Sequence, residues 1–320
     1  MAAAPESLRM IPLLIALDWG TSSLRAFLMG ADGNILERHS QPLGIMQTQP
    51  DGFAAAFALV AGPWMARWPH LPAIASGMIG STQGWVEAPY CRNATGAAEI
   101  ARNLLTIPVG NSGFLHIVPG LAKDAPQAEV MRGEETQILG ALAITPDLAD
   151  SQLLLPGTHS KWARLADARI TDFATFMTGE LFALLRTHSI LGRLQNDLPL
   201  DETGFETGVT AARDGDGISS LLFSARARVL LGSLPASASL PYLSGLLIGD
   251  EIRSALAAGY GKGRLAMIGA PVLCARYRRA LTLFGIRDIH TIEGAAEAGL
   301  WLIACQAGLI VPEPTQETMS

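Results

Sequence analysis

Lysine, cysteine and clustered positive charge are scarce in this 320-residue chain. Among its 23 basic residues only Lys123, Lys161 and Lys262 are lysines, and the net charge is −6 with a pI near 5.5. Binding to a nucleic-acid backbone needs a basic stripe, so the composition argues against a nucleic-acid partner. Any anion that binds here must be held by local hydrogen-bond donors. The three cysteines fit no C-x-x-C metal or redox spacing and indicate a reducing compartment.

Long hydrophobic runs are also missing. The apolar run at residues 11–17 ends on Asp18 and is expected to be a core strand rather than a signal peptide. Residues 298–311 are apolar but are interrupted by Gln306 and are shorter than a membrane span. With 49% hydrophobic and 16% charged residues the chain can bury two cores, so we expect a folded, cytoplasmic protein without a membrane partner.

The length of the chain indicates the number of its domains, and the absence of one motif limits the kind of phosphate site it can contain. At 320 residues the chain exceeds the size at which one core stops growing, so two domains of about 150 residues are expected. We place them at residues 1–148 and 149–292, followed by a C-terminal helix at 293–320 that returns to the domain boundary. The sequence contains no G-x-x-x-x-G-K-S/T motif, so a phosphate site here is not a Walker loop.

Residues 14–28 predict a β-hairpin with an anion-binding turn. An apolar strand ends on Asp18, a second apolar strand follows, and between them the chain turns through Gly20, Thr21, Ser22 and Ser23. Gly20 lets the backbone approach an anion closely because it has no Cβ, and the turn N–H groups and hydroxyls are uncharged donors. Asp18 suits a water-mediated contact to Mg²⁺. Taken alone, D-x-G-T equally fits an ordinary turn of small polar residues.

Residues 153–165 repeat this pattern about a domain's length further along the chain. The run LLLPGTHSKWARL places Gly157 and Thr158 after an apolar strand, and His159 and Ser160 precede the next strand. Such a repeat suggests two related halves, each offering a Gly-Thr turn to one polyphosphate ligand. His159 fits either a phosphate contact or a structural hydrogen bond.

Two further segments of the first half carry candidate substrate contacts. Residues 77–85 form a Gly-rich loop after a buried strand, which places Ser81 and Gln83 at a sheet's carboxyl edge, where α/β proteins bind ligands. A plain connection explains this loop equally well. Glu134 and Glu135 occupy the first turn of a predicted helix, where the helix dipole stabilises carboxylates. Arg132 lies on the other side of Gly133, and a charged trio that flanks a glycine at the start of an element also fits a substrate site.

The second half is predicted to alternate strands and helices, so both domains are α/β. Residues 201–216 are expected to be a polar crossing, and residues 218–231 one amphipathic helix. Residues 243–257 predict a long helix. Its Gly245 and Gly249 allow close approach of another helix or of a planar ligand.

The end of the chain offers a candidate adenosine site. Residues 264–268 are predicted to be the last buried strand, and Gly269 and Ala270 end it before a helix that starts with proline. A glycine at this point exposes strand-end backbone, which suits contact with an adenine or a ribose. An Ala- and Gly-rich helix at residues 292–309 closes the chain.

The order of these motifs resembles the sugar-kinase branch of the actin, hexokinase and Hsp70 ATPase superfamily. In detail, residues 132–137 (RGEETQ), 76–85 (SGMIGSTQGW) and 156–162 (PGTHSKW) resemble the 2-dehydro-3-deoxygalactonokinase family, and the resemblance covers nearly the whole chain. It implies an α/β fold with two ribonuclease H-like, actin-like ATPase domains facing an interdomain cleft. It also implies ATP and Mg²⁺ as cofactors and a small sugar acid as the substrate.

The resemblance further implies roles for individual residues. Asp18 would hold Mg²⁺, Gly269 and Ala270 would contact the adenosine, and the phosphates of ATP would lie on the two turns at Gly20, Thr21, Ser22 and Ser23 and at Gly157, Thr158 and His159. The superfamily's catalytic aspartate follows a glycine at a helix start, and Glu134 takes that place here. Glutamate has one methylene group more than aspartate, which changes the reach of the carboxylate. Ala270 stands where a second glycine is common in the superfamily.

We therefore expect ATP-dependent phosphorylation of 2-dehydro-3-deoxy-D-galactonate to its 6-phosphate in galactonate catabolism. Glu134 would accept the hydroxyl proton, with Glu135 as the alternative base. Arg132 and Arg25 are candidates to bind the carboxylate of the substrate, and Arg25 could instead bind the γ-phosphate of ATP. An ion pair within the protein is the other explanation for each arginine. Ser81 and Gln83 would bind the acceptor's hydroxyls. A kinase for another small sugar acid or polyol, and an ATPase module that drives a protein partner, are the alternatives. The epimer and the oligomer, a homodimer included, stay open.

Overall fold

The computed structural model describes residues 10–92, 94–110, 113–194 and 200–310. They divide into two compact units. The first contains the residues up to Ala149, the short segment Asp167–Thr171 and the residues from Gly294 onward. The second contains Asp150–Ala166 and Asp172–Glu293.

A six-stranded sheet forms the centre of the first unit, with the strand order β3-β2-β1-β4-β7-β6. The strands are β1 (Leu14–Trp19), β2 (Leu24–Met29), β3 (Ile35–Gln41), β4 (Ala73–Gly77), β6 (Leu105–Val109) and β7 (Gly113–Ile117). β1, β2 and β3 are antiparallel, whereas β4 runs parallel to β1 and β7 runs parallel to β4. All six residues of β1 are buried, which explains its unbroken apolar run up to Asp18.

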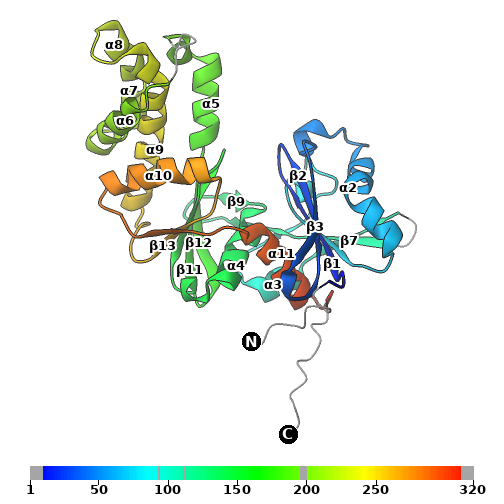
Figure 1. Cartoon of the computed structure of the whole chain (residues 1–320). Coiled ribbons are helices and arrows are strands. Elements are labelled where there is room, and N and C mark those ends of the chain that lie inside the picture. The colour runs from blue at the N-terminus through cyan, green and yellow to red at the C-terminus, as the bar shows by residue number, and fades with distance from the viewer. Residues whose placement is uncertain (1–9, 93, 111–112, 195–199, 311–320) are drawn as a thin grey trace. The chain divides into compact units, whose positions relative to one another are not determined.

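Helices cover both faces of this sheet (Figure 1). They are α2 (Phe53–Arg67), α3 (Ala97–Arg102), α4 (Glu134–Ile144) and α11 (Ala295–Gln306). α2 buries Phe53, Phe57, Val60 and Trp64 against the sheet, and the spacing of these residues places them on one face of the helix. α4 and α11 cross at two glycines. A Cβ on Gly140 would lie 1.8 Å from the Ala295 carbonyl oxygen, so only hydrogen fits in this contact.

A small second sheet in the first unit was not predicted. Its strands are β5 (Tyr90–Cys91), β8 (Gly120–Lys123) and β9 (Glu129–Met131), in the order β5-β8-β9. Because β9 ends at Met131, Arg132 lies between this sheet and α4, two residues before the helix begins. The sequence signal was weak because each strand has four residues or fewer.

The second unit repeats the topology of the first. Its five-stranded sheet has the order β12-β11-β10-β13-β14, with β10 antiparallel to β11 and β13 parallel to both β10 and β14. The strands are β10 (Gln152–Leu155), β11 (Ser160–Ala166), β12 (Arg169–Phe176), β13 (Leu265–Met267) and β14 (Ile289–Thr291). The first three residues of β12 are grouped with the first unit, and its other residues with the second. The predicted repeat of two hairpins in two related halves is therefore confirmed. β13 is completely buried, as predicted for residues 264–268, whereas only one residue is buried in the three-residue β14 that pairs beyond it.

An antiparallel meander extended by parallel strands on the side of its first strand is the order of a ribonuclease H-like domain. Both units have it, so the predicted α/β fold class of two ribonuclease H-like, actin-like ATPase domains is confirmed. In each unit the hairpin turn and the end of the neighbouring parallel strand lie at the same edge of the sheet, because β1 and β4, like β10 and β13, run in one direction.

Six α-helices among the described residues belong to the second unit. They are α5 (Thr178–His188), α6 (Thr203–Asp214), α7 (Ile218–Leu221), α8 (Ser224–Leu230), α9 (Ser239–Ala257) and α10 (Pro271–Leu283). Short 3₁₀ helices in the two units are η1 (Ala31–Gly33), η2 (Ile45–Gln47), η3 (Met78–Gly80), η4 (Pro146–Leu148), η5 (Ile190–Leu194) and η6 (Ala236–Ala238).

The predicted polar crossing at 201–216 was wrong, because most of it is the helix α6. Its glycines disfavour a helix locally, but they let α6 lie directly on α9. A Cβ on Gly208 would lie 2.1 Å from the Tyr242 carbonyl oxygen, and one on Gly245 would lie 2.1 Å from the Phe205 carbonyl oxygen. The close approach allowed by Gly245 is therefore used by another helix. The single helix expected at 218–231 is broken into α7 and α8.

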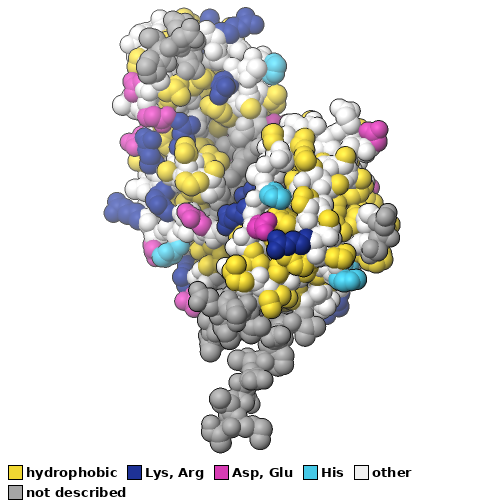
Figure 2. All heavy atoms as spheres, turned by 45° about the vertical axis from the view of Figure 1, so that its right-hand side comes forward, with side chains coloured by type: hydrophobic (Ala, Val, Ile, Leu, Met, Phe, Trp, Pro, Cys, Tyr) yellow, Lys and Arg dark blue, Asp and Glu magenta, His cyan; other side chains and the backbone are white. Residues whose placement is uncertain are grey.

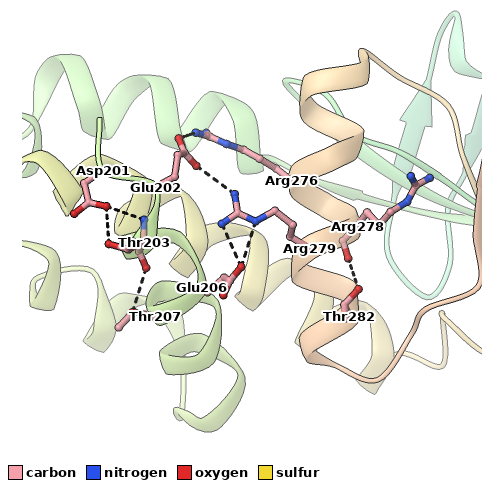
Figure 3. Close-up of polar contacts among 9 residues, drawn as sticks. All are labelled: Asp201, Glu202, Thr203, Glu206, Thr207, Arg276, Arg278, Arg279 and Thr282. Carbon is pink, nitrogen blue, oxygen red and sulfur yellow. Dashed lines mark hydrogen bonds and ion pairs between the residues drawn. The ribbon is translucent and has the colours of Figure 1, made fainter. Parts of the chain in front are cut away.

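Ion pairs join α6 to α10 (Figure 3). Glu202 pairs with Arg276, and Arg279 contacts both Glu202, at 3.5 Å, and Glu206, at 3.3 Å. Such half-exposed pairs contribute little free energy individually.

Hydrophobic side chains gather on the face of the first unit shown in Figure 2. α2 and the β6–β7 hairpin line an apolar cavity of about 580 Å³ in this unit, together with Trp85. Trp85 also stacks on Phe53, with ring centroids 6.5 Å apart, so its ring is part of the packing of this unit. No helix within the described residues is both long and apolar enough to cross a bilayer.

Candidate active site

The first turn directs its carbonyl groups inward. The Gly20 N–H closes the hairpin on the Ser23 carbonyl at 2.9 Å, so it is not available to a ligand. The N–H groups of Ile45 and Met46 donate to the carbonyls of Gly20 and Thr21, at 3.1 and 3.2 Å. These carbonyl groups therefore accept hydrogen bonds within the protein, while the Thr21 and Ser22 side chains are exposed. The turn fits an anion site, because the lone pairs of its carbonyl oxygens are directed away from a ligand.

Gly44 is the support of this turn that sequence reasoning missed. A Cβ at this position would lie 2.3 Å from both the Ser22 nitrogen and the Thr21 carbonyl oxygen. No larger residue leaves room for the Thr21–Ser22 peptide. The only signal in the sequence was a glycine between two apolar residues, Leu43 and Ile45, which is too common to indicate a site.

Asp18 faces Arg25 across the hairpin. The two residues are register partners in β1 and β2, and an Arg25 nitrogen pairs with Asp18 Oδ2. Burial raises the pKa of the Asp18 carboxyl, and the Arg25 guanidinium lowers it in opposition. Arg25 therefore has an intramolecular partner, which is the ion-pair explanation considered for it.

Two glycines with left-handed backbones bring Asp18 close to the start of α4. Gly77 ends β4 with φ of 95°, and a Cβ there would lie 2.7 Å from the Trp19 carbonyl oxygen and 3.6 Å from Asp18 Oδ1. Gly133 precedes α4 with φ of 105°, and its Cβ would lie 3.0 Å from the Gly77 Cα. Only glycine adopts these conformations without strain. Asp18 and Glu134, which are far apart in sequence, therefore flank the same turn.

Glu134 and Glu135 differ sharply in their surroundings. Glu134 is partly exposed, and its Oε2 accepts from the Arg132 N–H at 3.0 Å. Glu135 is completely buried and accepts from the Gly133 N–H at 2.7 Å and from the Thr136 hydroxyl at 3.0 Å. Burial, reinforced by the charge of Glu134, raises the pKa of Glu135 to about 7.

Arg132 is a buried cation with unused donors. It is 8% exposed, its Nη2 donates to the Ala88 carbonyl at 2.8 Å, and its guanidinium carbon lies 4.3 Å from the centre of the Tyr90 ring. Nε and Nη1 are buried without a hydrogen-bond partner. Each unsatisfied buried donor costs about 1–3 kcal/mol, so a carbonyl or carboxylate oxygen on these nitrogens would be strongly favoured.

The loop after β4 holds the two remaining candidates of the first unit. The Ser81 hydroxyl is buried and donates to the Met78 carbonyl at 2.8 Å, so it closes the loop and keeps only its lone pairs for other partners. Gln83 is exposed. A Cβ on Gly80 would lie 3.0 Å from Arg132 Nη1, so this loop packs beside the unused nitrogens of Arg132.

The second turn has the same inward carbonyls as the first. The Thr158 carbonyl accepts from the Glu180 N–H at 3.0 Å, and the Gly157 N–H donates weakly to Ser160 Oγ at 3.4 Å. Thr158 and His159 are exposed, and His159 Nε2 pairs with Glu180. His159 thus has a structural partner and still lies on the exposed side of the turn.

Gly269 and Ala270 lie beside this second turn. A Cβ on Gly269 would lie 3.3 Å from the Pro156 carbonyl oxygen, and both Gly269 and Ala270 are exposed. Ala270 caps α10, which starts at Pro271 as predicted. The second unit therefore brings together the residues predicted to hold phosphates and adenosine.

The donor set suits Mg²⁺ better than a tightly coordinated metal. No three His, Cys, Asp or Glu side chains among the described residues are placed to hold a metal ion. Mg²⁺ needs only one or two carboxylates, because substrate phosphates and water complete its shell. Asp18, with Oδ2 on Arg25 and Oδ1 beside the Gly77 turn, fits that requirement.

Known proteins are similar to this chain over most of its length. The model of the 2-keto-3-deoxy-galactonokinase family matches residues 18–303. The probable 2-dehydro-3-deoxygalactonokinase DgoK1 of Rhizobium meliloti (strain 1021) is 39% identical over 89% of this chain and 94% of its own length. The 2-dehydro-3-deoxygalactonokinase of Escherichia coli (strain K12) is 36% identical over 91% of this chain and 97% of its own length.

Solved structures agree on the fold. A Sinorhizobium meliloti crystal structure assigned to the same kinase has a TM-score of 0.81 with 37% identity, covering 91% of this chain and 98% of that one. An activator of 2-hydroxyisocaproyl-CoA dehydratase from Clostridium difficile, with bound ADPNP, reaches a TM-score of 0.50 at 12% identity and shares the fold alone.

Fold and site thus define a carbohydrate kinase with two actin-like domains. Within that class, the chain belongs to the 2-keto-3-deoxy-galactonokinase family.

Proposed function

We propose that this protein transfers the γ-phosphoryl group of ATP to the 6-hydroxyl of 2-dehydro-3-deoxy-D-galactonate, in galactonate catabolism. Family membership supports ATP and a small sugar acid as substrates. The observation that carries the proposal within this chain is that Asp18 and Gly133, the residue before Glu134, both lie against the turn at Gly77. That turn lies at the carboxyl edge of a sheet, where α/β enzymes bind ligands.

Glu134 is the proposed catalytic base. It accepts the proton of the 6-hydroxyl, whose oxygen attacks the γ-phosphorus while the bond to the bridging oxygen of ADP breaks. General-base catalysis of this kind contributes about 10²- to 10⁴-fold to the rate. Glu135 has the pKa nearer to neutrality, but its carboxylate is fully buried and occupied by two donors. A base must touch the proton it removes, so exposure favours Glu134.

Asp18 is proposed to hold Mg²⁺ through Oδ1 and water, and the bound ion would neutralise charge on the transferring phosphoryl group. The phosphates are assigned to the two turns, at Gly20, Thr21, Ser22 and Ser23 and at Gly157, Thr158 and His159. Gly269 and Ala270 are assigned to the adenosine. The inward carbonyls of both turns support these assignments.

Arg132 is proposed to bind the carboxylate of the sugar acid. Its two unpartnered nitrogens support this role, because charged hydrogen bonds contribute about 1.5–3 kcal/mol each. Arg25 is assigned to orienting Asp18 rather than to the carboxylate, since it already pairs with that residue. Ser81 and Gln83 are the proposed contacts for the acceptor's hydroxyls.

The test is a coupled assay of ADP release with ATP, Mg²⁺ and a set of sugar acids and polyols. Release that depends on 2-dehydro-3-deoxygalactonate supports the proposal. Dependence on a different acceptor assigns another substrate, and release indifferent to every acceptor indicates an ATPase module. The oligomeric state is open, a homodimer included, and is measured separately by light scattering. The cytoplasmic location is proposed because the reaction consumes ATP.

Glu134→Gln tests the assignment of the base. Because the neutral amide cannot accept a proton, kcat should fall by about 10²- to 10⁴-fold while ATP still binds. Glu87→Gln is the matched control, since Glu87 is an exposed glutamate of the same unit, and it should leave kcat unchanged. Near-normal turnover of Glu134→Gln would show that the base lies elsewhere, with Glu135 the first residue to examine.

A further inference from the structure

Glu251 is a buried carboxylate in the second unit that the phosphoryl-transfer chemistry does not use. It lies on α9 and is 2% exposed. Its Oε1 accepts from Trp162 Nε1 at 2.9 Å, and its Oε2 accepts from Tyr277 Oη at 2.5 Å and also from the Thr178 hydroxyl. Burial raises the pKa of Glu251, and the hydrogen bonds of these three donors oppose that shift.

One branch of this cluster leads through Tyr277 to the second turn. A carboxylate only accepts, so Tyr277 Oη must give its hydrogen to Glu251. The Tyr277 oxygen then accepts from Ser160 Oγ at 2.9 Å, and Ser160 Oγ presents lone pairs to the Gly157 N–H at 3.4 Å. The carboxylate of Glu251 therefore sets the direction of every hydroxyl between itself and Gly157.

A second branch leads through Thr178 to the other side of the same turn. Thr178 is the first residue of α5 and donates to Glu251. The next residue, Gly179, packs so tightly that a Cβ would lie 2.5 Å from the Gly157 carbonyl oxygen. Glu180 follows and donates its N–H to the Thr158 carbonyl. Glu251 thus fixes the start of α5, and the start of α5 fixes the turn.

Stability alone is a poor explanation for this carboxylate. Burying a charge costs several kcal/mol, and apolar residues of similar volume generally stabilise a core as well or better. An apolar side chain, however, could not direct three donors toward one point. We propose that Glu251 is a positioning residue that holds the Gly157–Thr158 turn in the conformation that receives the phosphates of the nucleotide. This inference rests on the proposed assignment of that turn to ATP.

The test compares Glu251→Gln and Tyr277→Phe with the wild type in steady-state kinetics and in calorimetric titration with ATP. The amide of glutamine cannot accept from Trp162 on one side and from two hydroxyls on the other. Tyr277→Phe removes only the branch to Ser160. Both variants should raise the KM and the Kd for ATP at least tenfold, about 1.4 kcal/mol, with kcat and the KM for the sugar acid within about threefold of wild type.

Glu206→Gln is the matched control, because it makes the same substitution on an exposed ion pair of the same unit (Figure 3). Glu206→Gln should change neither the KM nor the Kd for ATP. Thermal unfolding of each variant separates positioning from stability. A lowered Tm with an unchanged KM for ATP in both variants would overturn the inference. If Glu251→Gln does not fold, Tyr277→Phe decides it alone.

The wild type in the same experiment keeps the two proposals apart. If it binds ATP but phosphorylates no sugar acid, the proposed function fails, while the Kd for ATP of the variants still tests Glu251. If it phosphorylates the sugar acid and both variants bind ATP normally, the function stands and the role of Glu251 is refuted.

Discussion

The buried carboxyl of Glu135 should make the stability of the protein depend on pH near neutrality. Burial and the neighbouring Glu134 raise its pKa from 4.5 to about 7 in the folded protein. In the unfolded chain it ionises with its ordinary pKa. Between these two values the folded state keeps a proton that the unfolded state has lost, so stability falls as the pH rises through this window.

The size of the effect follows from the shift. Each unit of pKa corresponds to about 1.4 kcal/mol, so a shift from 4.5 to about 7 costs about 3 kcal/mol of unfolding free energy above pH 7. The penalty is absent below pH 4.5, where the carboxyl is protonated in both states. For a protein of ordinary stability, about 5–15 kcal/mol, a loss of this size is readily measured.

Glu135→Gln isolates this contribution. The amide does not titrate, and its oxygen still accepts from the Gly133 N–H. Urea titrations at half-unit steps from pH 4 to pH 8 give the free energy of unfolding of both proteins. The free energy of unfolding of the variant minus that of the wild type should grow by about 3 kcal/mol across this range. The contributions of carboxyl groups that titrate alike in both proteins cancel in this difference. If the free energies of unfolding of the two proteins ran parallel with pH, Glu135 would ionise normally despite its burial, and the reasoning would be refuted.

Three other predictions concern packing and ligands. Gly299→Ala should lower the free energy of unfolding by about 1–3 kcal/mol or more, because its Cβ would lie 1.9 Å from the Thr136 carbonyl oxygen. An unchanged free energy of unfolding, measured in urea, would contradict this. Arg132→Met should raise the KM for the sugar acid about ten- to hundredfold with the KM for ATP unchanged; an unchanged KM for the acid would remove Arg132 from the substrate site. Asp18→Asn should raise the Mg²⁺ concentration for half-maximal activity about tenfold or more, and an unaltered Mg²⁺ titration would place the ion elsewhere.

Local sequence determined the elements whose signals lie within a few residues. The apolar runs that end on Asp18 and before Gly157 predicted both hairpins, and Pro271 predicted the start of α10. The repeat of the two hairpins also predicted two related sheets, because strand direction and turn chemistry are encoded by neighbouring residues. The motifs at residues 76–85, 132–137 and 156–162, taken together with their order, were enough to identify the family.

Tertiary packing decided what depends on partners distant in sequence. The glycines of α6 oppose a helix locally and become favourable only when α9 lies against them. Glu134 and Glu135 are equivalent in sequence, and only folding buries one and exposes the other. Arg25 meets Asp18, and Glu251 meets Trp162, Thr178 and Tyr277, through the fold alone. Burial and hydrogen-bond direction are properties of the packed chain, so no local pattern contains them.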